Sequence, residues 1–208
     1  MSRLVFATRN RGKVVELERM LAGLGVVIDD LSTHPEVEEI EETGETFRDN
    51  AILKATTVAA RTGLVALADD SGLEVDGLGG RPGVRSARYA GEGASDDANN
   101  ARLVAEVTPL ASHLRTARYR CAIAVATPGG DVEVEEASVE GVIVTAPRGS
   151  RGFGYDPYFW VPELGRTMAE LDAHEKDGIS HRGRALRKAR VHVDRCLAIA
   201  TRHEPHGR

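Results

Sequence analysis

Hydrophobic and polar residues follow two different periods along this chain, and the period indicates which element each segment forms. Short apolar runs at 3–7, 26–28 and 64–68 are typical of buried strands. Helical spacing of apolar residues predicts one helix over about Lys13–Leu24, closed by Gly25. A second helix is predicted between the capping residue Thr46 and Gly63.

The second half of the chain changes to a hairpin pattern. Ser95 is a typical cap for a helix through Val107. Alternating apolar residues at 119–125 and 132–134 flank the turn 128–131, which predicts a β-hairpin. A strand at 142–144 and a last helix from Ser180 follow. Helix and strand alternate early and a hairpin comes late, so we expect a mixed sheet in a single α/β domain over 1–208, with a polar tail after about residue 200.

Composition excludes some classes of protein. Of the 208 residues, 41% are hydrophobic and 28% charged, which is typical of a globular protein. The net charge of −5 gives no basic field for nucleic acid. Cys121 and Cys196 lie in predicted elements and are expected to be buried thiols, which fits a reducing compartment. Without a leader or a long apolar run, the chain is predicted to be cytoplasmic and to have no membrane partner.

The run at 64–68 stops at two adjacent carboxylates, Asp69 and Asp70. Ligands of open α/β sheets gather at the carboxyl ends of such strands. Two buried carboxylates need a compensating cation, and Mg²⁺ with a phosphate supplies one. The alternative is a solvated Asp-Ser-Gly turn after the strand.

Three cations, Arg9, Arg11 and Lys13, crowd the start of the first predicted helix, where the helix dipole disfavours them. A bound phosphate would reverse that penalty. The spacing is not that of a Walker A loop. The alternative is a set of solvated cations with Asn10 as an ordinary helix cap.

Three other segments carry candidate chemistry. The glutamate-rich segment 36–45 predicts a solvated loop, from which one or two carboxylates could join Asp70 around a divalent cation. Segment 152–157 places two aromatic rings among glycines, which suits either a stacked ligand or a tight turn with core aromatics. Segment 176–183 is a second cationic helix start, in which His181 alone is typical of a surface or capping histidine.

Taken together, these segments resemble the inosine triphosphate pyrophosphatases, which hydrolyse non-standard purine nucleoside triphosphates. The resemblance covers residues 4 to about 189. It rests on motifs in family order: Thr8-x-Asn10-x-x-Lys13, 41–44 (EETG), 50–55 (NAILKA), 68–73 (ADDSGL), 81–89 (RPGVRSARY), 152–157 (GFGYDP) and 180–183 (SHRG).

The resemblance implies an elongated mixed sheet flanked by helices, two lobes with a central nucleotide-binding cleft, a homodimer and dependence on Mg²⁺. It also implies roles for single residues. The triphosphate would be held by Thr8, Arg9, Asn10, Arg11, Gly12, Lys13 and Lys54. The metal would be held by Glu41 and Asp70, with Asp69 as a further candidate, and Asp70 would accept the proton of the attacking water. The nucleotide and its base would be held by Ser71, Phe153, Gly154, Tyr155, Asp156, Lys176, His181 and Arg182.

The activity that the resemblance implies is hydrolysis of XTP, ITP or dITP to the monophosphate and pyrophosphate, which removes deaminated purines from the nucleotide pool. One rival is the septum-inhibitor-like family of nucleotide pyrophosphatases, whose opening motif ends in paired arginines, whereas this chain has Asn10 and Lys13. Another is a non-catalytic nucleotide sensor on the same scaffold. The Glu41 and Asp70 pair argues against a sensor, because sensing needs no water-activating carboxylate.

Overall fold

The computed structural model describes residues 2–23 and 25–203, and the chain divides into two compact units. The first unit comprises Met1–Asp70, Ala122–Glu136 and Ala185–Arg208, and the second comprises Ser71–Cys121 and Ala137–Arg184. Along the chain, the first boundary between the two units therefore falls between the adjacent residues Asp70 and Ser71.

The described strands form a seven-stranded sheet in the order β2-β1-β3-β4-β5-β6-β7. Strand β1 pairs in parallel with β2 and β3, whereas β6 pairs antiparallel with β5 and β7. This arrangement confirms the predicted mixed sheet. The strands are β1 Arg3–Phe6, β2 Val27–Asp30, β3 Val65–Val75, β4 Thr116–Ala126, β5 Val132–Ile143, β6 Phe159–Val161 and β7 Arg166–Thr167.

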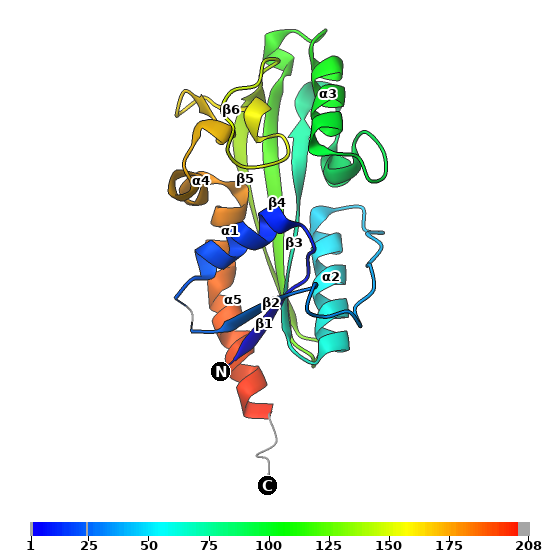
Figure 1. Cartoon of the computed structure of the whole chain (residues 1–208), viewed down its shortest axis with the longest axis vertical. Helices are drawn as coiled ribbons and strands as arrows, with labels where there is room; N and C mark the ends of the chain where they lie inside the picture. The colour runs from blue at the N-terminus through cyan, green and yellow to red at the C-terminus, as the bar shows by residue number, and fades with distance from the viewer. Residues whose placement is uncertain (1, 24, 204–208) are drawn as a thin grey trace. The chain divides into compact units, whose positions relative to one another are not determined.

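In the first unit, helices cover both faces of the strands. Figure 1 shows α2 (Phe47–Thr62) on one side and α1 (Arg11–Leu21) and α5 (His181–His203) on the other. Helix α1 connects β1 to β2, and α2 connects β2 to β3 on the other side of β1. Because such crossovers are right-handed and these two run in opposite directions across the sheet, α1 and α2 lie on opposite faces. Helix α2 begins where Thr46 accepts a hydrogen bond from the backbone of Asp49, and it ends at Gly63 in the left-handed conformation.

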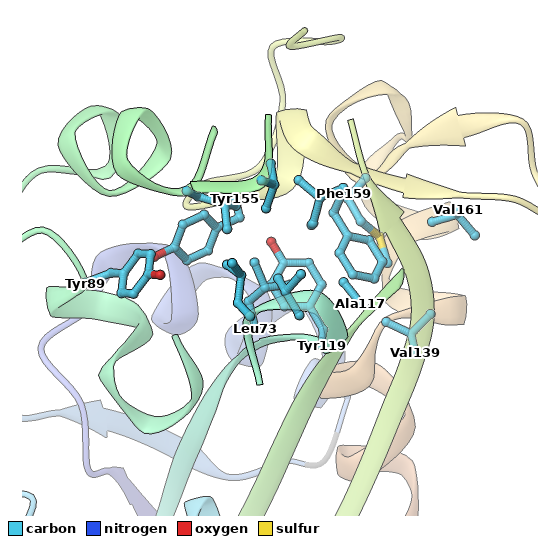
Figure 2. Close-up of a cluster of buried hydrophobic side chains, with 14 of the residues drawn as sticks. Leu73, Tyr89, Ala117, Tyr119, Val139, Tyr155, Phe159 and Val161 are labelled. Atoms are coloured by element: carbon cyan, nitrogen blue, oxygen red, sulfur yellow. The ribbon is translucent and has the colours of Figure 1, made fainter. Parts of the chain in front are cut away.

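The second unit contains α3 (Asp96–Val107), α4 (Ala173–Ile179) and a buried apolar cluster that includes several aromatic rings. Figure 2 shows Tyr119 and Phe159 side by side in this cluster, with Tyr89 and Tyr155 at another part of it. Short 3₁₀ helices complete the connections: η1 Asp76–Leu78, η2 Gly83–Arg88, η3 Ser112–Leu114, η4 Asp156–Tyr158 and η5 Met168–Glu170.

The structure corrects the predicted end of the central strand. Strand β3 does not stop at Ala68 but continues through the two aspartates to Val75. Leu73 and Val75 are fully buried, so the strand returns to the core after the polar pair. Asp69 and Asp70 therefore lie within a strand and not on a turn.

Other boundaries differ by smaller amounts. The predicted strands at 132–134 and 142–144 are parts of the single strand β5, and α4 was not predicted. Helix α1 ends at Leu21, and Leu24 lies outside the described residues. Helix α5 continues to His203, so the predicted tail begins inside it, and residues 204–208 lie outside the described part of the chain. Among the described residues, none of the helices has the length and apolar character that a membrane crossing requires.

Candidate active site

In the first unit, Lys54 is a buried cation that contacts three acceptors. Its Nζ lies 2.8 Å from Asp70 Oδ1, 2.9 Å from Glu42 Oε1 and 2.9 Å from the backbone oxygen of Asp69. Burial alone would lower the pKa of Lys54, but the charges of Asp70 and Glu42 and their hydrogen bonds raise it above its usual value. Lys54 is therefore a permanent positive charge at this site.

Lys13 makes the matching contact to Asp69. Its Nζ lies 2.5 Å from Asp69 Oδ1, and the Asp69 side chain is fully buried. Successive side chains of a strand point to opposite faces of the sheet. Asp69 thus meets a lysine of α1 and Asp70 a lysine of α2, and each buried carboxylate has its own cation.

One oxygen of Asp70 is left for a ligand. Asp70 Oδ2 is buried and has no hydrogen-bond partner among the residues that the structure describes. Burial raises the pKa of Asp70 and the charge of Glu42 adds to the rise, while Lys54 and Lys13 oppose it. A buried carboxylate oxygen without a donor is costly, and a divalent cation would compensate it.

The carboxylates that meet at Lys54 are hard oxygen ligands of the kind that bind a divalent cation. Within the described residues, no cluster of three or more His, Cys, Asp or Glu side chains is placed to hold a metal ion. Mg²⁺ usually keeps several waters and binds through one or two carboxylates together with substrate phosphates. Asp70 and Glu42 offer hard oxygen ligands of that kind. The two carboxylates lie close together, since both contact the same Lys54 ammonium nitrogen.

The family resemblance named Glu41 as a metal ligand, which stays a prediction, and the structure adds its neighbour Glu42 as a second candidate. The structure places Glu41 at the surface, whereas Glu42 is half-buried against Lys54. Gly44 holds this turn in place, because its backbone N–H donates to Asn50 Oδ1 at 2.7 Å and a Cβ there would collide with the same atom. Position within a run of glutamates carries no signal that separates Glu41 from Glu42.

The turn that precedes α1 is built by its own polar side chains. Asn10 Oδ1 accepts from the backbone N–H of Lys13, and Thr8 Oγ1 accepts from that of Asn10, both at 3.1 Å. Arg9 donates to the backbone oxygen of Val37 at 2.8 Å. Asn10 is thus a helix cap, as the alternative interpretation of this segment predicted. The predicted phosphate contacts of Thr8, Arg9, Asn10, Arg11 and Gly12 stay a prediction.

In the second unit, Asp156 is the centre of a buried polar network. Its Oδ2 lies 2.5 Å from Lys176 Nζ and accepts from the backbone N–H of Phe153 at 3.0 Å. Its Oδ1 accepts from the hydroxyl of Tyr119 at 3.3 Å. Gly152 has a φ of +76°, and a Cβ there would collide with Asp156 Oδ2, so only glycine allows this loop to wrap the carboxylate.

Two cations face the ring of Phe153. Lys176 Nζ lies 4.9 Å and Arg182 Cζ 5.6 Å from its centroid, within the range of cation–π attraction. Arg182 is only 2% exposed and donates to Ser71 Oγ at 2.9 Å. His181 is also buried, and its ring stacks on that of Tyr119. The structure therefore brings together six of the predicted nucleotide-binding residues: Ser71, Phe153, Asp156, Lys176, His181 and Arg182.

Helix α3 and the 3₁₀ helix η2 fix the remaining predicted residues of the glycine-rich loop. The N–H of Gly154 donates to Asp96 Oδ2 at 2.7 Å, and its carbonyl accepts from Asn100 Nδ2 at 2.9 Å. The Tyr155 hydroxyl donates to the backbone oxygen of Ser86 at 2.7 Å. Asp96, Asn100 and Ser86 had no sequence signal that linked them to this loop.

The chain is thus a mixed α/β protein with buried lysine–aspartate pairs in one unit and a cation-flanked aromatic ring in the other, groups whose chemistry suits phosphate and planar rings respectively. The chain belongs to the Ham1 family, whose sequence profile matches residues 4–192.

Relatives of known name and structure agree with this assignment. A dITP/XTP pyrophosphatase of Geobacter sulfurreducens is 52% identical over 193 residues, which cover 93% of this chain and 97% of the relative. One from Bacillus subtilis is 50% identical over 188 residues, covering 90% and 95%. The structure of a HAM1 protein from Coxiella burnetii superposes with a TM-score of 0.84 at 41% identity, covering 94% of this chain and 100% of that one.

Proposed function

We propose that this protein hydrolyses non-standard purine nucleoside triphosphates, namely XTP, ITP and dITP, to the monophosphate and pyrophosphate. The observation that carries the proposal is the Lys54–Asp70 pair, in which one buried carboxylate oxygen, Oδ2, has no hydrogen-bond partner in the described part of the chain. The relatives named dITP/XTP pyrophosphatase support the substrate class.

We assign the triphosphate to the first unit. In the free protein, Lys13 pairs with Asp69 and Lys54 pairs with Asp70 and Glu42, and a triphosphate offers both lysines competing oxygens. The N-terminus of α1 adds backbone N–H groups and the positive end of a helix dipole. Transfer of a phosphoryl group depends mainly on such positioning and charge neutralisation.

The divalent ion is assigned to Asp70 with Glu42 or Glu41, and Mg²⁺ is the proposed ion. When bound with substrate, it would neutralise charge that develops on the phosphate oxygens. Asp70 takes the proton of the attacking water, whose oxygen forms a bond to the α-phosphorus. The bond between the α-phosphorus and the bridging oxygen to the β-phosphate breaks, and pyrophosphate leaves with that oxygen.

The base is assigned to the second unit. The ring of Phe153 offers a stacking surface, while Lys176 and Arg182 offer donors. Hypoxanthine and xanthine carry an acceptor oxygen at C6, where adenine carries an amino donor. Donors held in place by Asp156 and Ser71 therefore favour hypoxanthine and xanthine over adenine.

We further propose a cytoplasmic homodimer. Cys121 and Cys196 are buried and form no disulfide, in keeping with a reducing compartment. The dimer rests on the family resemblance, and sedimentation should give about twice the chain mass of 22.4 kDa. A monomer at micromolar concentration would contradict the dimer without affecting the catalytic assignment.

The experiment that tests the function is incubation of the purified protein with ITP or XTP and Mg²⁺, followed by an assay for pyrophosphate. We expect stoichiometric pyrophosphate and nucleoside monophosphate, and no release of single phosphate. Tight binding of ITP without turnover would contradict the proposal and favour a nucleotide sensor.

A further inference from the structure

We propose that Tyr119 is a positioning residue for the base-binding groups, because it contacts His181 with its ring and Asp156 with its hydroxyl. Its ring centroid lies 4.7 Å from that of His181 with the planes inclined by 16°. Its Oη lies 3.3 Å from Asp156 Oδ1. The inference rests on the proposed function, since it assigns a role in recognition of the base.

The hydroxyl of Tyr119 is unexpected from packing alone. Tyr119 is 6% exposed and belongs to an apolar cluster that includes Phe159, whose ring centroid lies 4.4 Å away. Figure 2 shows the phenol ring among these apolar side chains. Phenylalanine would fill the same space, and a buried hydroxyl is tolerated only when it finds a partner. Here that partner is the carboxylate of Asp156, the residue that binds Lys176.

The direction of this hydrogen bond is fixed. Burial, together with the nearby charge of Asp156, raises the pKa of the Tyr119 phenol well above its ordinary value. The phenol therefore stays protonated and donates to the carboxylate. Asp156 receives donors from Tyr119 on one oxygen and from Lys176 and the backbone of Phe153 on the other, which fixes its plane.

The location of Tyr119 suits a positioning role. It lies within β4, whereas Asp156 is on the glycine-rich loop and His181 is the first residue of α5. Groups held by a strand are placed more rigidly than groups on a loop. One strand residue thus orients both the carboxylate that holds Lys176 and the imidazole beside Arg182. Loosening it should weaken base recognition without changing the chemistry at Asp70.

The test is Tyr119→Phe, which keeps the ring and removes only the hydroxyl. The matched control is Tyr89→Phe, since Tyr89 is also 6% exposed, belongs to the same cluster and donates to a carboxylate, Glu106, at 2.7 Å. Calorimetry with inosine monophosphate and adenosine monophosphate measures base binding directly, and steady-state kinetics with ITP separate KM from kcat.

We expect Tyr119→Phe to weaken binding of inosine monophosphate by roughly two- to tenfold, the range of one ordinary hydrogen bond. Binding of adenosine monophosphate should change less. The KM for ITP should rise by a similar factor with kcat unchanged, the signature of lost uniform binding. Tyr89→Phe should leave all three values as in the wild type.

Two results would overturn the inference: wild-type affinities in Tyr119→Phe, or an equal loss in Tyr89→Phe, which would mark a general packing effect. If Tyr119→Phe does not fold, the wild-type protein decides the question by NMR. In the free protein, the ring current of Tyr119 should displace the His181 resonances from their usual chemical shifts. Addition of inosine monophosphate should then change these chemical shifts. Failure of either effect would contradict the positioning role. Absence of ITP hydrolysis by the wild type would contradict the proposed function instead.

Discussion

Lys54 Nζ lies 2.8 Å from Asp70 Oδ1, and both side chains are almost fully buried. An isolated buried charge of either kind would be very costly, whereas the pair is tolerated because each charge compensates the other. Under the proposed function, the pair would supply the two charges that phosphate hydrolysis requires: a cation for the substrate and a carboxylate for the metal and the water. The substrate would then exchange partners with charges that are already in place.

Asp70→Asn should nearly abolish turnover and keep the fold. The amide is nearly isosteric but provides neither an anionic ligand nor a base, and loss of both functions typically costs several orders of magnitude in rate. The amide oxygen can still accept from Lys54. Pyrophosphate release by the purified variant, with circular dichroism as the folding control, measures this. A variant that retained more than about a tenth of the wild-type rate would show that Asp70 is not the base.

Glu42→Gln should raise the Mg²⁺ concentration needed for half-maximal activity. Glu42 is the second carboxylate on Lys54, and removing a group beside a metal ligand usually costs about 10- to 100-fold in metal affinity. Glu38→Gln, an exposed residue of the same loop, is the matched control. An unchanged Mg²⁺ requirement would limit Glu42 to balancing the charge of Lys54.

The helix caps and the aspartate pair show what the sequence can and cannot predict. The capping residues Thr46 and Ser95 have local signals, and both helices begin where predicted. The aspartate pair looked like the end of a strand because two buried carboxylates have no local compensation. Their compensation comes from lysines that lie 16 and 56 residues away in sequence, which no local pattern reveals.

Helix α4 was missed although its signal is local. Asp172 and Glu175 form a capping box, with the backbone N–H of each bonded to the side chain of the other. The helix is only seven residues long, too short to show an apolar period. By contrast, the convergence of Ser71 and Arg182 depends on residues 111 positions apart, so only the family resemblance pointed to it.

Lys13→Ala should weaken binding of ITP far more than binding of inosine. The change removes a charge-assisted contact to phosphate, worth roughly 1.5–3 kcal/mol, but no contact to the nucleoside. It also leaves Asp69 without its ion pair, so the variant needs a thermal unfolding control. Calorimetry with both ligands measures the difference. Equal losses for ITP and inosine would indicate a structural defect and not a phosphate contact.

The buried tyrosines should make the protein lose stability in alkali. Burial and a hydrogen bond to Glu106 raise the pKa of Tyr89 to about 12, and burial also raises the pKa of Tyr119 and Tyr155. Unfolded tyrosine ionises near pH 10. The neutral phenols therefore stabilise the fold fully below about pH 10, and this contribution declines as the pH rises from there towards about 12.

The absorbance of phenolate against pH checks this expectation. At about pH 11 the folded protein should keep Tyr89, Tyr119 and Tyr155 protonated, and denaturant should ionise them together. Tyr89→Phe should lose stability less steeply over the same range. Ionisation of Tyr89, Tyr119 and Tyr155 near pH 10 in the folded protein would contradict the burial that the structure assigns to them.

Arg182→Lys should narrow the preference for ITP over ATP. The guanidinium lies over Phe153 and is oriented by Ser71, so it can present a donor to the C6 oxygen of hypoxanthine. Against adenine, the same donor would face an amino group, and an unpaired buried donor costs about 1–3 kcal/mol. Sites built on such hydrogen bonds discriminate by roughly 10⁴ or better. Lysine keeps the charge but loses the planar fork.

The measurement is kcat/KM for ITP and for ATP in the wild type and in Arg182→Lys. We expect the value for ITP to fall and the ratio of ITP to ATP to shrink, because the variant loses the group that distinguishes the two bases. Arg184→Lys is the matched control, since Arg184 lies two residues further along α5 and donates from an exposed side chain to the backbone oxygen of Ser138. If Arg182→Lys lost activity on both substrates by the same factor, Arg182 would bind phosphate or support the fold, and the base would be read by Lys176 and His181.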